Sequence, residues 1–381
     1  MMRKFCLLIL LLCTLCSCVH QFPVESTPAK VKITLSFDTE MPYFRTLMFP
    51  DQTGSNMTFT DDPENKPAYF ESILPDWQTG AENYRIRYVA EAYRVLASGK
   101  VSTYPEKRYV GYDEDATVWD DYSFTLELSE GTYEIRAWAD YILKYSDDHL
   151  YYDVTTFSGI RLNHKNGHYG NTDFRDAHSG RSRVEAIRYG QNHELAHTVV
   201  NMSRPMGKYV FVATDLYEFA TKVLMNRSVS IDPSKSPTKS PDFNIEDYTL
   251  TIRCSQWLPT SYSMNTDKAN DSEVNVQFKS SLKAIDDNHA IMGFDYVFAN
   301  GNDQVTKVVL DIILQDKDGT VLASHGGVYV HLKRSKMTLI EGNFLIQESS
   351  SLNSCLSKPA AFSILSERSE FEHTSSAKLS V

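Results

Sequence analysis

Residues 193–197, with the sequence HELAH, match the H-E-x-x-H motif of zinc hydrolases. In this pattern two histidines on one helix face bind zinc, and the glutamate activates a water molecule. A third ligand is also needed, and Glu218, 21 residues beyond His197, could be a distant one. The residues that follow the motif, 198–200, are β-branched and favour a strand. In a strand the two imidazoles would lie about 13 Å apart, too far to share one metal ion. We therefore expect neither a metal centre nor catalysis here, and zinc hydrolysis is the most remote alternative.

The start of the chain could receive a lipid. Arg3 and Lys4 precede a short apolar run, and residues 15–18, Leu-Cys-Ser-Cys, follow it. The run is too short to span a bilayer, and this order of charge and hydropathy is typical of a secretory signal. Its Leu-x-Ser-Cys ending resembles a bacterial lipobox, which predicts a signal peptide over residues 1–17 and lipidation of Cys18. Two or three acyl chains, such as palmitate, bind a membrane far more firmly than one. A signal peptide cut elsewhere and a retained membrane anchor remain the alternatives.

Three tryptophans stand in or beside predicted loops and could stack against a ligand: Trp77, Trp119 and Trp257. The chain also holds 22 Tyr and 19 Phe, enough aromatic rings for a sugar-binding platform. Most of these rings alternate with polar residues, which is typical of core positions and cross-strand pairs. Loops carry ligand sites more often than strands do, so the three tryptophans are the candidates for a ligand surface. They form the basis of an alternative function, that of a surface glycan-binding lipoprotein.

Composition narrows the class of function. The chain has 381 residues, which suggests about two domains. Its formal net charge is −11, which argues against nucleic acid as a partner because phosphate contacts need clustered Lys and Arg. We find no G-x-S-x-G, P-loop or G-x-G-x-x-G motif, so no enzyme class and no cofactor is indicated. Beyond the leader only Cys254 and Cys355 remain, and whether they pair is open.

Alternation of apolar and polar residues predicts an all-β chain. Every second side chain is apolar over residues 31–37, and the same period recurs over 84–95. Residues 122–128 and 133–139 alternate on either side of Gly131, which predicts a β-hairpin with one face toward water. Further strands are expected within residues 209–214, 248–254, 257–262, 274–278, 291–298, 305–314, 320–324, 328–332 and 337–345. The two strands on either side of residues 316–319 should form a second hairpin, and residues 216–224 a short helix with Asp215 as its N-cap.

These elements predict two tandem β-sandwich domains, over residues 31–203 and 204–346, after a tether over 18–30. Residues 38–80 are expected to form a long loop because they are rich in Pro, Asp, Thr, Asn and Gly. The serine-rich residues 347–381 read as a disordered, low-complexity tail. The alternatives for this tail are a strand donated to another subunit and a shifted reading frame.

An ordered set of segments resembles one family. They are the lipobox-like leader, SFDTEMP, RAWADY, GNTDFRDAHSG, RPMGKYVFVATDL, LPTSYSMNTDKANDS and LKRSKMTLIEGNFL. Together, over residues 1–346, they look like the fimbrillin-type lipoproteins of Bacteroides-type bacteria, which include the anchor and accessory subunits of surface fimbriae. The resemblance implies two transthyretin-like β-sandwich domains, a lipidated N-terminus and a non-enzymatic role in fimbrial assembly or adhesion. The tail departs from the family, whose members usually end in a further strand.

We therefore expect an outer-membrane lipoprotein that acts through protein contacts. Cys18 would fix it to the membrane, and an open sheet edge would accept or donate a strand with a fimbrial subunit. The first acid after Cys18 is Glu25, so no acidic run follows the lipid site, and exposure at the cell surface is implied by the resemblance alone.

Overall fold

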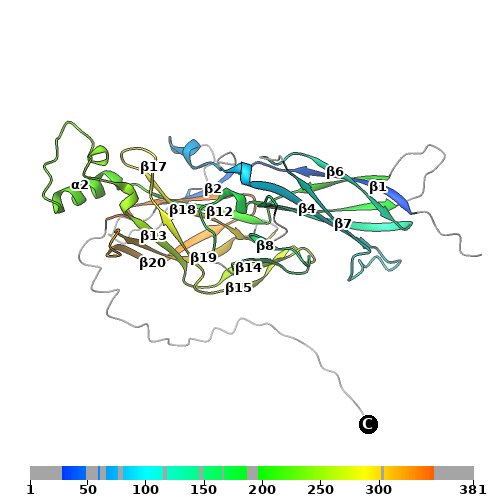
Figure 1. Ribbon diagram of the computed structural model, residues 1–381. Helices are drawn as coiled ribbons and strands as arrows, with labels where there is room; N and C mark the ends of the chain where they lie inside the picture. The colour runs from blue at the N-terminus through cyan, green and yellow to red at the C-terminus, as the bar shows by residue number, and fades with distance from the viewer. Residues whose placement is uncertain are drawn as a thin grey trace, which may run out of the picture.

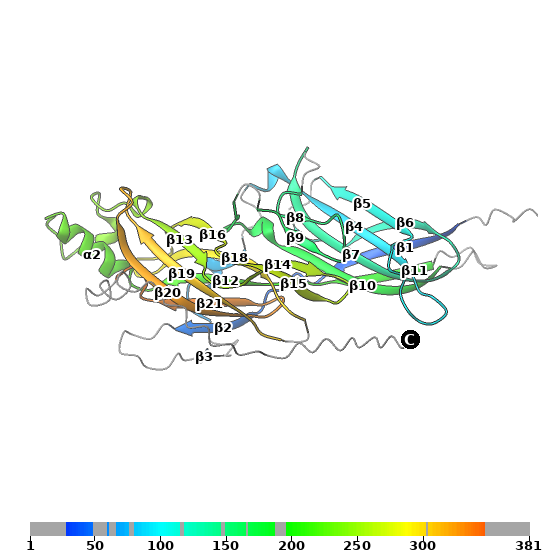
Figure 2. The same ribbon diagram turned by 90° about the horizontal axis from the view of Figure 1, so that it is seen from below.

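The computed structural model describes residues 28–48, 59–60, 66–75, 80–114, 118–145, 149–164, 167–186, 196–301 and 304–346. Within these ranges the chain is all-β, as its alternation predicts, with a single α-helix, α2 (Leu216–Asn226). The strands form an elongated molecule with α2 near one end and the start of β1 near the other (Figures 1 and 2). In the described ranges no helix combines the length and the apolar character that a membrane span requires.

Two facing sheets form the part of the molecule that begins with β1. One sheet has the order β11-β1-β6, with bounds Ala196–Met202, Ala29–Phe37 and Tyr122–Leu128. The other has the order β10-β7-β4-β5, with bounds Ala177–Ala186, Gly131–Leu143, Tyr84–Arg94 and Lys107–Asp113. Between them pack the inward side chains of alternating strands, among them Leu35, Tyr88 and Val200, all fully buried or nearly so. The predicted half-buried strand over 31–37 is confirmed as β1, and the strand predicted over 84–95 is present as β4, although β4 is buried on both faces.

The predicted hairpin across Gly131 is wrong in its pairing, although both of its strands are present. Strand β6 pairs with β1, whereas β7 pairs with β4 and β10, so the connection at residues 129–130 crosses from one sheet to the other. Both strands turn their apolar side chains toward the same core, but from opposite sides of it. Alternation identifies the buried face of a strand and leaves its hydrogen-bonding partner undetermined, which explains the error.

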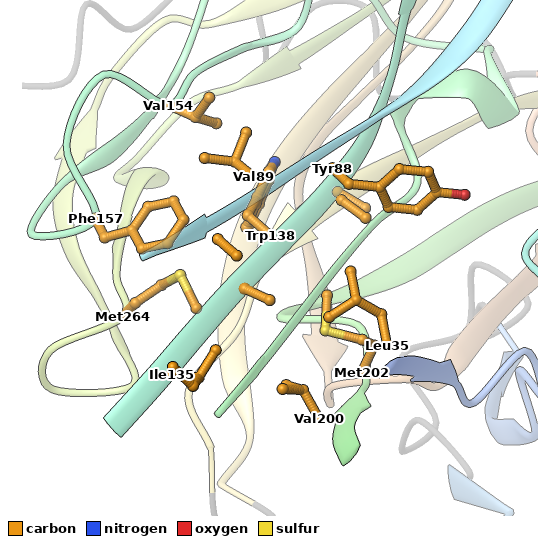
Figure 3. Close-up of a cluster of buried hydrophobic side chains, with 14 of the residues drawn as sticks. Leu35, Tyr88, Val89, Ile135, Trp138, Val154, Phe157, Val200, Met202 and Met264 are labelled. Carbon is orange, nitrogen blue, oxygen red and sulfur yellow. The ribbon is translucent and has the colours of Figure 1, made fainter. Parts of the chain in front are cut away.

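The second face of β7 is covered as well, although alternation predicts that this face meets water. A four-stranded sheet lies over it, with the order β15-β14-β9-β8 and the bounds Lys268–Glu273, Leu258–Ser263, Ile160–Leu162 and Tyr152–Asp153. Figure 3 shows Trp138 of β7 on the side of Phe157 and Met264, away from Leu35 and Val200. Charged side chains on this face are paired, and Arg87 binds Asp140 of β7 at 2.6 Å. Pairing reduces the cost of burying these charges, so the face can be both polar and covered.

Two further sheets form the other part of the molecule. The larger one runs β17-β18-β12-β21-β2-β3, with bounds Lys283–Ala284, Ala290–Phe298, Met206–Ala213, Met337–Gly342, Tyr43–Met48 and Phe59–Thr60. The smaller one runs β16-β13-β19-β20, with bounds Gln277–Ser281, Thr249–Cys254, Thr306–Gln315 and Val321–Leu332. Apolar side chains such as Phe211, Leu250 and Val330 fill the space between them. The predicted hairpin of β19 and β20 is confirmed, with Gly319 at φ +82° in its turn.

Short 3-10 helices complete the described structure: Phe70–Ile73, Ala81–Asn83, Asp173–Arg175, Pro237–Lys239 and Ile245–Asp247. Helix α2 confirms the predicted short helix, and Asp215 stands at its N-cap position without a side-chain capping bond. The Asp215 carboxylate instead accepts hydrogen bonds from the backbone N–H groups of Leu345 at 3.0 Å and Ile346 at 2.9 Å. Asp215 therefore ties the last described residues to the start of the helix.

Two segments pair across residue 203, the predicted domain boundary. Strand β2 lies within the predicted loop of residues 38–80, yet it runs parallel to β21 in the larger sheet of the second part. Strands β14 and β15, from beyond residue 203, join β9 and β8 over the first part. The predicted division into 31–203 and 204–346 stays a prediction. The signal peptide and the tail, residues 1–17 and 347–381, lie outside the described residues.

Candidate functional site

Cys18 and Trp77 lie outside the described residues, as do residues 193–195 of the HELAH segment. The described part of that segment belongs to β11, which begins at Ala196. His197 lies in this strand, with its Nε2 3.1 Å from the Thr34 Oγ1 of the neighbouring β1. Among the residues that the structure describes, no three His, Cys, Asp or Glu side chains are grouped so that they could hold a metal ion.

Trp119 is buried, with 5% of its surface exposed, which differs from the prediction of a ligand surface. Its ring stacks on Phe37 with 5.3 Å between ring centroids, and its Nε1–H donates to Asp176 Oδ2 at 3.1 Å. Trp119 thus belongs to the core because both its ring and its polar atom find partners there. Trp257 differs, since 65% of its surface is exposed just before β14.

Buried ion pairs join segments that are distant in the sequence. Asp176 binds the Arg204 guanidinium at 2.9 Å, and Arg204 in turn donates to the carbonyl oxygens of Asp38, Thr39 and Glu40. Burial raises the pKa of the Asp176 carboxyl, against the opposing effect of Arg204. Because the Asp176 carboxylate and the Arg204 guanidinium are both hydrogen-bonded, they hold the segment between β1 and β2 against the start of β12. The arrangement is structural, because the paired charges are shielded from solvent.

A second buried cluster lies where β18 meets the 3-10 helix Asp173–Arg175. Arg175 binds Asp295, and His168 Nε2 lies 2.6 Å from the same carboxylate. Burial acts to raise the pKa of Asp295, but Arg175 and His168 outweigh it and hold that pKa below its ordinary value. Burial lowers the pKa of His168, so its imidazole resists protonation even beside a carboxylate. Lys208 binds Asp173 at 2.8 Å nearby.

Cys254 lies in the second core and forms no disulfide within the part of the chain that the structure describes. Burial raises the pKa of its thiol, so it stays protonated and unreactive at neutral pH. Cys355 lies outside the described residues, and whether the two pair stays open.

The edge strand β5 is the clearest candidate for a protein contact. Among the described strands it pairs with β4 alone, which leaves its other side open. Tyr109 faces inward, where its ring stacks on Phe124 with 4.0 Å between centroids. Val110 and Tyr112 are 44% and 38% exposed, and the preceding Tyr104 is 81% exposed. The strand is therefore anchored to the core on one face and presents apolar side chains on the other.

Charge is polarised along β5. Lys107 and Arg108 stand at its start, and Asp113 and Glu114 at its end. Arg85 of β4 lies over the Tyr112 ring at 4.0 Å and binds Glu114 at 2.6 Å. A partner strand with the opposite order of charge would complement this edge. Strand β5 was not expected from the sequence, because Tyr109, Val110 and Tyr112 place apolar residues on both of its faces and so break the period-two signal.

Two other described edges, β20 and β16, are less suited to pairing. Strand β20 has register shifts against β19, and the exposed Gly326 and Gly327 lie within it. Strand β16 spans only Gln277–Ser281. Bulges and short length are the usual features that protect an edge from pairing, so β5 stands apart from these two.

A search of curated proteins finds no match to this chain. Among solved structures it resembles the fimbrial anchor protein Mfa2 from Porphyromonas gingivalis, at 13% identity over 78% of this chain and 82% of that one, with a TM-score of 0.35. It also resembles a proposed cell adhesion protein from Bacteroides eggerthii, at 12% identity over 84% and 89% of the two chains, with a TM-score of 0.38. A proposed adhesin from Bacteroides ovatus matches at 12% identity over 82% and 87%, again with a TM-score of 0.38.

These neighbours are of the class that the ordered sequence segments resemble, and similarity at this level assigns no function to the chain. A family model gives the firmer result, since it matches residues 29–354 and so takes in every described strand. The chain belongs to DUF6562, a family described as one of unknown function.

Proposed function

We propose that this chain is an outer-membrane lipoprotein that serves as an anchor or accessory subunit of cell-surface fimbriae. It would act through protein contacts and without catalysis. Lipidation of Cys18 would tether the body to the membrane. The partner would be another fimbrial subunit, which would add a strand of opposite charge order to β5. The ordered fimbrillin-like segments support the class of function, and the open edge of β5 supports the mode of contact.

The observation that carries the proposal is the exposure of Val110 and Tyr112 on an unpaired strand edge. Strand addition draws affinity from backbone hydrogen bonds and specificity from alternate side chains. An open edge with exposed apolar residues is a liability for a protein that meets no partner. A partner strand that pairs with β5 would close this open edge.

Affinity capture from native envelopes tests the mode of contact. The tagged full-length chain should recover fimbrial subunits, identified by mass spectrometry, and Val110→Lys should reduce that recovery at least tenfold. A lysine at this position places charge on the edge, which disfavours strand pairing. Val305→Lys is the matched control, because Val305 is 41% exposed and precedes β19 away from β5. Equal recovery by both variants would remove β5 from the proposal, and recovery of no envelope protein by the unchanged chain would remove the fimbrial role.

Fractionation tests the anchor separately. The unchanged chain should sediment with outer membranes and incorporate labelled palmitate, whereas Cys18→Ala should do neither. Cys16→Ala is the matched control, since Leu15 stands where the lipobox needs a small residue. Retention of Cys18→Ala in the membrane fraction would show that the lipid site was misassigned.

A further inference from the structure

The charge order of β5 complements that of a second β5 strand. Lys107 and Arg108 stand at its start, Asp113 and Glu114 at its end, and Val110 lies midway. When two such strands run antiparallel, the start of each lies beside the end of the other, so that positive charge meets negative charge at both ends. A parallel arrangement would instead set like charges against each other, which destabilises a strand pair. The edge therefore fits an antiparallel second copy of this chain.

The backbone restricts how two copies can be aligned. Strand β5 pairs with β4 over seven consecutive residues, Lys107–Asp113, without a register shift. In such a strand alternate residues direct their N–H and C=O groups to the neighbour, and the residues between them direct theirs outward. Outward groups of one copy must meet outward groups of the other. This condition holds when a two-fold axis passes through a residue, and it fails when the axis passes between two residues.

Val110 is the residue that best fits this axis. With the axis there, all seven residues of β5 lie opposite residues of the second copy, and Lys107 lies opposite Asp113 twice. Val110, which is 44% exposed in the single chain, lies opposite its own copy, so two apolar side chains meet. Arg108 lies opposite Tyr112, and a guanidinium beside an aromatic ring is also a favourable pair.

Axes at the neighbouring residues fit less well. An axis at Tyr109 would set Asp113 opposite Pro105, which has no N–H group to donate. An axis at Gly111 would set Asp113 opposite Tyr109 and place Lys107 opposite a residue beyond the end of β5. Either shift removes both pairs of Lys107 with Asp113 and shortens the paired segment.

Contacts within the chain already hold β5 in place on both faces. On one face Arg108 binds Glu91 and donates to the carbonyl oxygen of Val154 at 2.6 Å. On the other face the Tyr109 hydroxyl lies 2.8 Å from the Tyr122 hydroxyl of β6. A strand that is ordered beforehand loses little conformational freedom when it pairs, so little of the pairing energy is lost to ordering. Strand β5 also lies at the margin of the molecule (Figure 2).

We propose that two copies of this chain pair antiparallel through β5, about a two-fold axis at Val110. The two four-stranded sheets β10-β7-β4-β5 would then join into one sheet of eight strands, and neither copy would keep an open β5 edge. The same patch on both partners is the usual contact in symmetric dimers. The inference rests on the proposed function, since it uses β5 as a pairing edge, and it names the second copy as the occupant while no other subunit is bound.

Cysteine cross-linking of the purified full-length chain tests the proposal. The chain is kept in a mild detergent without other subunits, and copper phenanthroline is the oxidant. Every variant carries Cys355→Ser, whereas the buried Cys254 stays in place. Directly opposed Cα atoms lie about 4.5 or 5.5 Å apart, within the range of about 4.4–6.8 Å that a disulfide bridges. Val110→Cys should therefore form a covalent dimer on non-reducing electrophoresis at least tenfold faster than two control variants.

The controls test register and random collision. In Tyr112→Cys the two new thiols would stand four residues apart along the strands, about 13 Å, which is too far for a disulfide. Val305→Cys, 41% exposed and away from β5, measures collision between exposed thiols. All three positions are exposed, and far-UV circular dichroism checks that each variant is folded. Equal rates for the three variants would overturn the proposal.

Charge exchange tests whether the edge is complementary to itself. In the Val110→Cys chain, Lys107→Glu should slow cross-linking at least threefold, because it sets an acid against Asp113 in both pairs. Adding Asp113→Lys should restore the rate, since both pairs are then reversed. An unlike partner strand would give no such rescue. Further slowing by the second change, or no effect of the first, would contradict self-pairing.

The result is separable from the affinity capture that tests the proposed function. Rapid cross-linking of Val110→Cys, with no fimbrial subunit recovered from envelopes, would support the dimer and remove the fimbrial role. Recovery of fimbrial subunits, with Val110→Cys cross-linking no faster than Val305→Cys, would overturn the dimer and leave the fimbrial role in place.

Discussion

At the scale of single residues, the buried carboxylates decide how the chain is held together. Asp176 receives both the Arg204 guanidinium and the Trp119 indole N–H, and its surface is fully buried. Removing one member of such a pair leaves the other buried without a counter-charge, which costs far more than the pair itself contributes.

We therefore expect Asp176→Asn to lower the free energy of unfolding by about 3–5 kcal/mol, measured by urea denaturation. Asp318→Asn, in the exposed turn before β20, should change it by no more than about 0.5 kcal/mol. The tryptophan fluorescence of Asp176→Asn should also differ from that of the unchanged chain, because Trp119 donates to Asp176. Equal stability of the two variants would contradict the structural role assigned to the Asp176 pair.

Asp215 should make stability depend on pH in a distinctive direction. Burial raises the pKa of its carboxyl to about 6, although the N–H groups of Leu345 and Ile346 act to lower it. The folded chain therefore holds this proton more tightly than the unfolded chain, whose Asp titrates near 3.8. The contribution is fully present below the unfolded pKa and is lost as pH rises through about 6.

Asp215→Asn removes this titration and leaves every other carboxyl in place. Between pH 4 and 7 the unchanged chain should lose up to about 3 kcal/mol of unfolding free energy relative to the variant. Urea denaturation at a series of pH values measures the difference. A difference that does not vary with pH would show that Asp215 is not perturbed by its burial.

Sequence alone could not separate Trp119 from Trp257. Both stand beside predicted loops, and the features that distinguish them are tertiary: Phe37 and Asp176 come from distant segments to cover Trp119. The charged row of Asp153, Arg161 and Asp271 on the sheet that covers β7 could not be predicted either, because these residues meet only through the pairing of β8, β9, β14 and β15.

At the scale of elements, the hairpin of β14 and β15 carries much of the contact between the two parts of the molecule. Met264, in its turn, is 2% exposed and packs among the side chains around Trp138 (Figure 3). Arg181 of β10 also donates to the Met264 carbonyl oxygen at 3.0 Å. The hairpin thus completes a core that includes β7, a strand that ends more than a hundred residues before it in the chain.

Met264→Ala should lower the unfolding free energy by about 2–5 kcal/mol, since it leaves a cavity in this core. Met225→Ala, on the exposed side of α2 with 64% of its surface exposed, should change it by about 0.5 kcal/mol or less. Thermal and urea denaturation of the two variants measure both effects. A small effect of Met264→Ala would indicate that the hairpin lies loosely on β7.

Most strands could be predicted from alternation, and their partners could not. The pattern of residues 122–128 identified β6 but assigned it to β7, because alternation records which side of a strand is buried. Strand β2 escaped prediction because its six residues stand among Pro, Asp and Asn. The longer of its two described partners, β21, also lies almost three hundred residues away in sequence. Local signals are weak wherever a strand is stabilised mainly by distant pairing.

At the scale of the whole molecule, segments exchanged across residue 203 couple the two parts. Strand β2 enters the sheet of β21, and β14 enters the sheet of β9. We expect scanning calorimetry of the full-length chain to show one cooperative unfolding transition, because neither part can lose its core without removing a strand from the other. Two well-separated transitions would contradict this coupling and would favour independent domains.

The all-β class follows from the sequence because period-two alternation recurs over most of the chain. The interlocking of its parts does not, since it depends on pairings that no local pattern records. Ordered segments and composition therefore predicted the class of the protein better than its internal connections.

The placement of β1 has a mechanical consequence. Its hydrogen-bonding partners, β11 and β6, lie on both sides along its length, and the chain continues from β1 through Phe37 toward β2 in the other part of the molecule. The start of β1 lies near one end of the molecule (Figure 1). Tension applied to the N-terminus would pull β1 lengthwise, so that its bonds to both neighbours are sheared together and do not open one after another. Resistance to force is set by the unfolding rate and not by equilibrium stability, so a chain tethered at its first residues would gain endurance from this strand order.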